Sequence, residues 1–306
     1  MNPLRQRTGR RAARANGHAA PAPLAPPPAP PLPADYAQLL QALLPPQRPG
    51  VSSHRFGGER VWLKKAGPRH GRLRYRLLAA ISAVLRLDVL TPVPNPGGPE
   101  AIAIEARRLR TLAEAGLRVP RVLAQQDEGL LMSDLGESGR GAMTLEERLQ
   151  HAAAEGPAAL LAAWREGLEA IARVHARGQY LSQAFARNLV CCPDGEIGFI
   201  DFEDDPGAVL SLVECQTRDW LSYLHATAMP LHAAAARGSG AEWHDALAGI
   251  DPEVRTRLAH AAHRMRWLTH LPASRRWGRD TQRVRAAARL LREWYGPPPR
   301  PRPRAR

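Results

Sequence analysis

Two oxygen-bearing side chains flank a predicted hairpin late in the chain. Residues 188–192 lead into Pro193-Asp194-Gly195, a turn signature, and residues 196–200 return to Asp201. Antiparallel pairing would set Asn188 beside Asp201 at the open end of this hairpin. An amide oxygen and a carboxylate suit Mg²⁺, a hard cation that takes one or two protein oxygens together with waters and phosphate oxygens. On spacing alone, an ordinary hairpin with polar ends is the favoured interpretation, and a magnesium site is the alternative.

The basic residues are almost all arginine. Of 43 Lys and Arg residues, only Lys64 and Lys65 are lysine. A compact ammonium differs from a planar guanidinium in reach and hydration, and a tight phosphate site can require the ammonium. The pair therefore points to a phosphate-binding residue, with chance survival of two neighbouring codons as the alternative. The sequence leaves open which of the two lysines faces the phosphate.

The order of these residues resembles a known catalytic arrangement. Residues 61–64, VWLK, have the V-x-x-K form of a small-lobe strand of kinases, and the helix predicted after them offers Glu105. Together with Asn188 and Asp201, this order resembles the protein-kinase-like superfamily. Within it, the chain is most similar to the bacterial lipopolysaccharide core (Kdo and heptose) kinases and to RIO-type kinases. The resemblance covers about residues 50 to 230.

The resemblance implies roles for these residues and two ligands, ATP and Mg²⁺. It places the phosphates of ATP on Lys64, held by the carboxylate of Glu105, and it places Mg²⁺ on Asn188 and Asp201. Asn188 and Asp201 are thereby expected to be both metal-binding and catalytic.

The resemblance also assigns a nucleotide hinge and a support for the catalytic loop. Residues 129–136 match the last small-lobe strand and the hinge, where backbone groups of Asp134 and Leu135 would bind the adenine edge. Asp219, in Arg218-Asp-Trp220, matches a helix Asp that hydrogen-bonds the backbone of the catalytic loop.

Two departures from the family pattern affect the expected chemistry. No G-x-G-x-x-G precedes Lys64, so the cover over the phosphates must be short. The family's base Asp stands five residues before the Asn, and Gln183 occupies that position here. A Gln cannot accept a proton at neutral pH and can only orient a hydroxyl or a water. The acids at 203–205 could add a carboxylate to the site, although a solvated acidic turn is the favoured interpretation.

The function expected from these features is an ATP-dependent phosphotransferase. Its acceptor would be a hydroxyl of a sugar or of a lipopolysaccharide-type cell-envelope molecule, either small or lipid-linked. The alternative is a catalytically attenuated or silent nucleotide-binding module that regulates or scaffolds a partner, because of Gln183.

The elements that must position these residues follow from hydrophobic periodicity and turn signals. Few strands early and many helices late predict an α+β, two-lobed, protein-kinase-like fold. The small lobe, about 34–135, would be mostly antiparallel strands with a helix, and the larger helical lobe would span about 136–295. The predicted strands are 52–56, 59–65, 121–125, 130–133 and the 188–201 hairpin. The predicted helices are 35–44, 72–90, 100–115, 144–154, 158–177, 215–228, 253–271 and 281–295.

The net charge of +14 is concentrated at the chain ends. Residues 1–33 carry five Arg and nine Pro without an acid, and residues 296–306 carry four Arg. Both segments are expected to be disordered. Because the body between them is only mildly basic, no specific nucleic-acid partner is expected.

Composition also suggests a location. Three cysteines without C-x-x-C or metal-type spacing argue against a disulfide framework and a zinc site, which suits a reducing compartment. A cytoplasmic protein is expected, because no uncharged apolar run approaches 18 residues. The basic ends and the amphipathic helix at 72–90 predict weak contact with an anionic inner membrane. A helix packed on the domain and ends that serve solubility are the alternatives, and the oligomeric state is left open.

Overall fold

The computed structural model describes residues 32–68, 97–137, 141–234, 236–272 and 274–296. Most of the basic N-terminal arm, the C-terminal tail after 296 and the helix predicted at 72–90 lie outside these residues. Their predicted disorder and membrane contact therefore stay predictions. Within the described ranges, no helix combines the length and apolar character needed to cross a bilayer.

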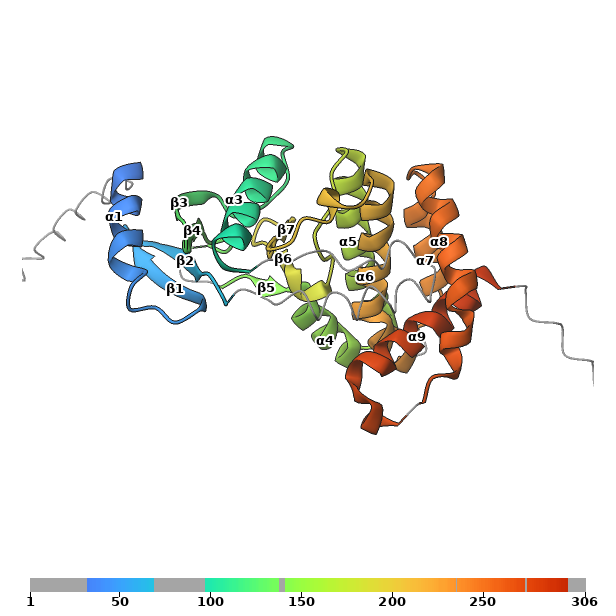
Figure 1. The fold of residues 1–306 in the computed structure, drawn as a ribbon. Helices are drawn as coiled ribbons and strands as arrows, with labels where there is room; N and C mark the ends of the chain where they lie inside the picture. The colour runs from blue at the N-terminus through green and yellow to red at the C-terminus, as the bar shows by residue number, and fades with distance from the viewer. Residues whose placement is uncertain (1–31, 69–96, 138–140, 235, 273, 297–306) are drawn as a thin grey trace, which may run out of the picture.

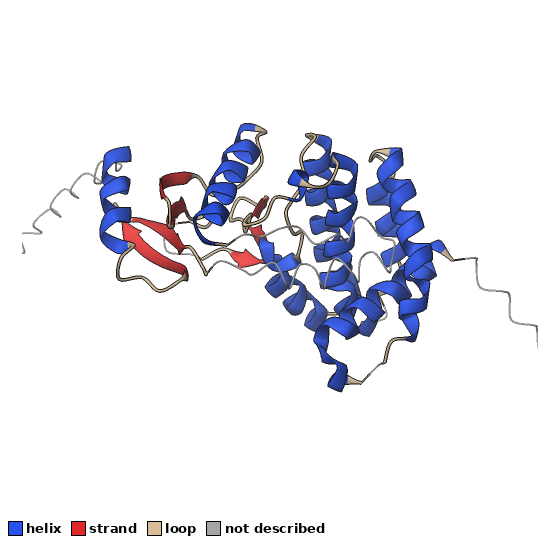
Figure 2. Ribbon diagram, in the orientation of Figure 1, coloured by secondary structure: helices blue, strands red, loops and turns tan. Residues whose placement is uncertain are grey.

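The fold is α+β, as predicted. The described residues form eight α-helices and two small antiparallel sheets. Figure 2 shows the strands gathered in the N-terminal half and in the middle of the molecule, whereas the C-terminal half consists of helices. The site is built where the two kinds of structure meet.

The first sheet has four strands in the order β1-β2-β4-β3. They span β1 Gly50–Phe56, β2 Glu59–Lys65, β3 Val122–Gln126 and β4 Gly129–Ser133. Gly57 and Gly58, at φ 57° and 82°, make the tight β1–β2 turn that needs two left-handed residues. Helix α1 (Pro33–Leu43) packs on β3 and β4 through Tyr36 and Leu40. All four predicted strands and this first helix are confirmed.

Helix α3 (Gly98–Glu114) lies beside β3 and β4. Its apolar side chains Ile102, Leu109 and Leu112 are buried in the main core, at the 3.6-residue spacing of an amphipathic helix. Glu105 is buried along with them, so the helix carries a carboxylate into the interior.

The second sheet is the predicted late hairpin with one added strand. β6 (Leu189–Cys191) pairs with β7 (Ile197–Phe199), and β5 (Met143–Thr144) joins the outer edge of β6. Leu189 lies opposite Phe199, so the register sets Asn188 opposite Ile200 at the open end, and the predicted partner Asp201 follows one residue later. β5 was not predicted, because two residues carry no periodicity.

The remaining helices form the C-terminal half (Figure 1). Trp164, Trp220 and Trp243 are fully buried at its centre. The predicted helix at 253–271 changes at Arg264 into a 3₁₀ segment, and α7 was not predicted. The helices are α4 Leu145–Glu155, α5 Pro157–Ala176, α6 Leu212–Ala233, α7 Ser239–Leu247, α8 Pro252–Arg264 and α9 Gly278–Tyr295; the 3₁₀ turns are η2 Ala186–Asn188, η3 Pro206–Ala208, η4 Met265–His270 and η5 Arg275–Trp277.

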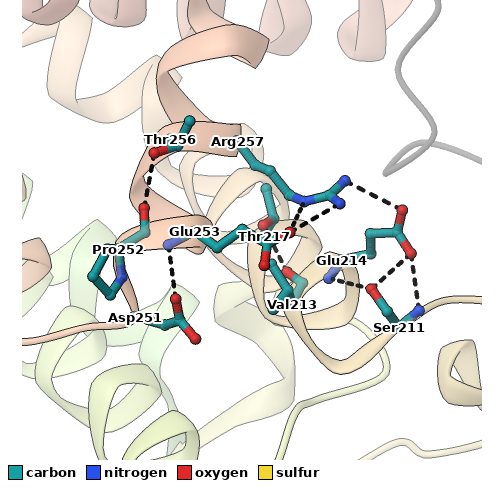
Figure 3. Close-up of polar contacts among 9 residues, drawn as sticks. All are labelled: Ser211, Val213, Glu214, Thr217, Asp251, Pro252, Glu253, Thr256 and Arg257. Carbon is teal, nitrogen blue, oxygen red and sulfur yellow. Dashed lines mark hydrogen bonds and ion pairs between the residues drawn. The ribbon is translucent and has the colours of Figure 1, made fainter.

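The start of α6 is fixed by polar contacts, shown in Figure 3. The Ser211 hydroxyl accepts a hydrogen bond from the Glu214 amide at 3.3 Å, and the Glu214 carboxylate accepts one from the Ser211 amide at 2.9 Å. This capping box satisfies two amides at the helix start. Arg257 of α8 pairs with Glu214 at 3.2 Å and with Glu253 at 3.1 Å. These contacts set where α6 begins and therefore which of its side chains reach the site.

Candidate active site

A cavity of about 640 Å³ lies between the first sheet and the second. Its apolar wall includes Leu109, Met132, Val190 and Ile200. Six of the seven predicted site residues line it: Lys64, Glu105, Asp134, Leu135, Asn188 and Asp201. Gln183, the seventh, lies in the loop before Asn188 and is not among the lining residues. Volume and lining are those of a small-molecule pocket with a few convergent polar groups.

Lys64 is the ionic centre of the cavity. Its Nζ lies 2.6 Å from Glu105, 2.8 Å from Glu203 and 3.3 Å from Asp201. Burial lowers the pKa of Lys64, but the three carboxylates outweigh this effect and raise it above its ordinary value. The ammonium therefore stays charged at physiological pH, although the side chain is only 7% exposed.

Lys65 also lines the cavity, but its ammonium group is bound elsewhere. Its Nζ donates to the carbonyls of Leu44 and Pro45, at 2.9 Å and 3.4 Å. Neighbouring side chains of a strand point to opposite faces, so only the ammonium group of Lys64 meets the carboxylates of the cavity. The structure therefore resolves the choice that the sequence left open in favour of Lys64.

Glu105 ties α3 to the segment after β7. Burial raises the pKa of its carboxyl group, and the ammonium of Lys64 opposes that rise. Glu105 also accepts a hydrogen bond from the Phe202 amide at 3.4 Å. The carboxylate thus fixes Lys64 and the backbone beside Asp201 together.

Asp201 adopts a strained backbone. Its φ of 72° is the only positive value at a non-glycine position in the part of the chain that the structure describes. Such a conformation costs about 1 to 3 kcal/mol and persists where the surroundings impose it, often at functional sites. Here it accompanies a carboxylate turned towards Lys64.

Asn188 lies opposite, at the start of the hairpin. Its side-chain Nδ2 donates to the Gln183 carbonyl at 3.1 Å, and its own carbonyl accepts from the Ile200 amide at 3.0 Å. The first bond fixes the orientation of the amide group, because a carbonyl accepts only from the NH₂ end. The oxygen end of Asn188 is left for another ligand.

Gln183 is held by a residue that the sequence did not single out by itself. Its Nε2 donates to the Asp204 carboxylate at 3.1 Å, and the Ser182 hydroxyl donates to the Asp204 carbonyl at 2.6 Å. Burial raises the pKa of Asp204, while the bond from Gln183 and the charge of Arg218 oppose that rise. Because the carboxylate receives the NH₂ end of Gln183, the Oε1 end points away from Asp204.

The prediction of a solvated acidic turn at 203–205 is wrong. Glu203 pairs with Lys64, and Asp204 is 5% exposed. Asp205 accepts a hydrogen bond from the Tyr180 hydroxyl at 2.5 Å and pairs with Arg107 at 3.0 Å. Each of the three acids has a partner from another segment, which a sequence pattern cannot reveal.

Asp219 supports the loop as predicted. It is fully buried on α6 and accepts hydrogen bonds from the Leu181 amide at 2.8 Å and from His175 Nε2 at 3.0 Å. Arg108 of α3, which the sequence analysis missed, donates to the Tyr180 carbonyl at 2.7 Å. The loop before Asn188 is thus held from α3, α5 and α6.

The predicted hinge residues have hydrogen bonds within the chain. The Asp134 carboxylate accepts from Trp62 Nε1 at 2.8 Å and from the Leu135 amide at 3.1 Å. A short Asp side chain readily bonds the next backbone amide. Asp134 and Leu135 both line the cavity, and their backbone contact with adenine stays a prediction.

The donor set of the cavity suits one kind of cation. Among the described residues, no group of three or more His, Cys, Asp and Glu side chains has the placement of a metal site. The Asp201 carboxylate and the Asn188 amide line the cavity together with Glu203, and Mg²⁺ accepts such oxygens when phosphate oxygens complete its shell. Three carboxylates around a single ammonium also leave a surplus of negative charge for a cation to balance.

Comparison with known proteins adds no relative. No protein-family model matches the chain, and no curated protein matches it.

Proposed function

We propose that this protein is an ATP-dependent phosphotransferase of the protein-kinase-like superfamily. Its small lobe would span about residues 34–135 and its large lobe about 136–295, with ATP between them. The observation that carries the proposal is the contact of Lys64 with Glu105 and Asp201 in a cavity that Asn188 also lines. An ammonium fixed by a helix carboxylate, opposite an Asn and an Asp, is the arrangement of phosphoryl-transfer sites.

Lys64 would bind the phosphates of ATP. Its raised pKa keeps the ammonium charged, and its contacts with Asp201 and Glu203 can give way to phosphate oxygens while Glu105 still fixes it. Leu109, Met132 and Val190 give the apolar surface that an adenine ring requires.

Asn188 and Asp201 would hold Mg²⁺. The fixed amide of Asn188 and the exposed carboxylate of Asp201 present oxygens to the same cavity. When bound, Mg²⁺ neutralises phosphate charge and orients the transferred group. Asn188 and Asp201 supply the fixed geometry for that effect.

Gln183 would orient the acceptor hydroxyl. With its NH₂ end on Asp204, its Oε1 can accept a hydrogen bond from the hydroxyl without removing the proton. A loose phosphoryl-transfer transition state depends mainly on positioning and charge, so loss of a true base lowers the rate without abolishing it. The acceptor class we propose is a sugar or lipid-linked saccharide hydroxyl.

Gln183 also favours a second candidate, a silent nucleotide-binding module. In that case the cavity binds ATP and the loop transfers nothing. Transfer of radiolabelled γ-phosphate to cell-envelope extracts separates the two: labelled product supports the enzyme, and ATP binding without product with any acceptor supports the silent module.

The test of the shared nucleotide site is a thermal shift. Mg-ATP is expected to raise the Tm of the wild type and to leave the Tm of Asp201→Asn unchanged. Asn tolerates the left-handed backbone, so this variant removes the charge while keeping the fold. Equal shifts in the wild type and in Asp201→Asn would contradict the assignment.

A further inference from the structure

A second cavity, of about 390 Å³, is lined by neighbours in sequence of residues that line the first. Arg187 and Glu146 line it, whereas the neighbouring residues Asn188 and Thr144 line the large cavity. The loop before Asn188 and the start of α4 therefore lie between the two cavities. Helices α6 and α9 contribute the opposite side, through His225 and through Asp280 and Arg283.

The two arginines that line this second cavity have no close ion-pair partner among the described residues. Arg283 lies 3.7 Å from Glu146 and 3.6 Å from Asp280, which are long for hydrogen-bonded pairs. The guanidinium of Arg187 lies 4.5 Å above the ring of Phe185, and among the described residues no carboxylate lies within ion-pair distance of it. Arg187 is thus a cation held in place by an aromatic ring.

His225 lines the same cavity as these two arginines. Its ring lies 6.1 Å from that of Phe185. Burial lowers the pKa of His225, as do the charges of Arg283 and Arg187, and only Asp280 acts in the opposite direction. The lowered pKa favours the neutral imidazole, and an anion bound beside it would oppose the effect of the two arginines.

We propose that this second cavity binds an oxyanion group, a phosphate or a carboxylate, of the acceptor molecule. The inference rests on the proposed phosphotransferase function and assigns its acceptor to acidic small molecules or acidic saccharides. Arg187 supplies the main charge-assisted hydrogen bonds, Arg283 can turn from its long ion pairs to the ligand, and His225 gains a proton when the anion arrives.

The position of Arg187 links binding to transfer. Gln183 and Arg187 are four residues apart on one loop that Asp219 holds in place. An acceptor anchored through its oxyanion on Arg187 keeps a hydroxyl near Gln183 and the large cavity. Anchoring of this kind replaces a random encounter by a fixed approach, which lowers the entropic part of the barrier.

The test uses the full chain with inorganic phosphate as the probe. The NMR signals of the His225 imidazole are followed during a phosphate titration at constant pH. In the wild type, phosphate is expected to shift His225 towards its protonated form. Arg187→Gln is expected to weaken this response about tenfold, because one charge-assisted pair is lost. Arg173→Gln, an exposed arginine of α5 outside the cavity, serves as the matched control and should respond like the wild type.

Two outcomes would overturn the site: no His225 response in the wild type, or a response that Arg187→Gln leaves unchanged. A Lys64→Met variant tests whether the response comes from phosphate bound in the large cavity instead. Its His225 response should persist, because Lys64 does not line the second cavity. Failure of the proposed function would look different. Mg-ATP would then give no thermal shift in the wild type, whatever phosphate does at His225.

Discussion

At the scale of single residues, Lys64 matters both for the stability of the fold and for the proposed chemistry of the site. Its ammonium neutralises the buried carboxylate of Glu105 and faces the cavity at the same time. Removing it would leave Glu105 buried and unpaired, a situation that is strongly destabilising. The same substitution would remove the ammonium group that is proposed to bind the phosphates of ATP.

Lys64→Met is therefore expected to lower the free energy of unfolding by about 3 kcal/mol, measured by urea denaturation. Adding Glu105→Gln should restore much of that stability, because no buried charge remains, but should not restore a thermal shift by Mg-ATP. Lys65→Met is the matched control. It loses only hydrogen bonds to carbonyls, costs about 1 kcal/mol and keeps the shift. Loss of the shift in Lys65→Met would refute the choice of Lys64.

Gln183 and Asp204 allow a prediction about pH. Gln183→Asp would place a second carboxylate beside Asp204, where the amide now lies at 3.1 Å. Like charges at that distance raise the pKa of the pair in the folded state. Between the unfolded and the raised folded pKa, the folded state binds more protons, so stability falls as pH rises. Relative to the wild type, Gln183→Asp should lose stability steadily above about pH 4.

The double variant Gln183→Asp/Asp204→Asn provides the control. It moves the carboxylate to the loop position without repulsion, so its pH dependence of unfolding should match the wild type. In a γ-phosphate transfer assay it should be at least as active as the wild type if a base helps the reaction. A pH dependence as steep as that of the single variant would show that Asp204 is not the interacting group.

At the scale of elements, α6 supports the loop before Asn188. Its start is set by the Ser211 capping box and by Arg257, and two turns later Asp219 meets Leu181 and His175. A shift of the helix would move Asp219 out of reach of the loop.

Asp219→Ala is accordingly expected to cost about 2 to 4 kcal/mol in unfolding free energy, because two buried donors lose their acceptor. It should also reduce phosphate transfer more than its stability loss explains, since the loop loses its support. Ser211→Ala, on the same helix, should cost about 1 kcal/mol and leave transfer and Mg-ATP binding unchanged, because Arg257 still holds the helix start through Glu214. Equal effects of both substitutions on transfer would mean that Asp219 acts through stability alone.

At the scale of the whole molecule, one apolar core runs through both halves. A single cluster of buried residues includes Ile102 and Met132 beside the first sheet and Trp164 and Leu258 among the helices. The ion pair of Lys64 and Glu105 lies next to this cluster. The two halves are therefore expected to lose their structure together.

Thermal unfolding followed by far-ultraviolet circular dichroism and by tryptophan fluorescence should give coincident transitions. Mg-ATP should move both by the same amount, because the ligand binds where sheet and helices meet. Two separate transitions, with only the first shifted by Mg-ATP, would show that the halves unfold independently.

Part of this protein could be predicted because the information is local. Strand and helix periods located the four strands of the first sheet, most helices and the late hairpin. Hairpin pairing located the end of the hairpin at which Asn188 and Asp201 lie, although Asn188 is paired with Ile200, and the scarcity of lysine singled out residues 64 and 65. Each of these inferences depends on residues a few positions apart.

By itself, then, the sequence determined the α+β class and six of the residues that line the large cavity. Only the tertiary structure decided which lysine presents its ammonium group to the carboxylates there, that Asp204 is buried against Gln183, and that Arg187 and His225 share a second cavity. The physical reason is common to these cases. Each depends on side chains from segments far apart in the chain, and burial and partner charges arise only when those segments pack together.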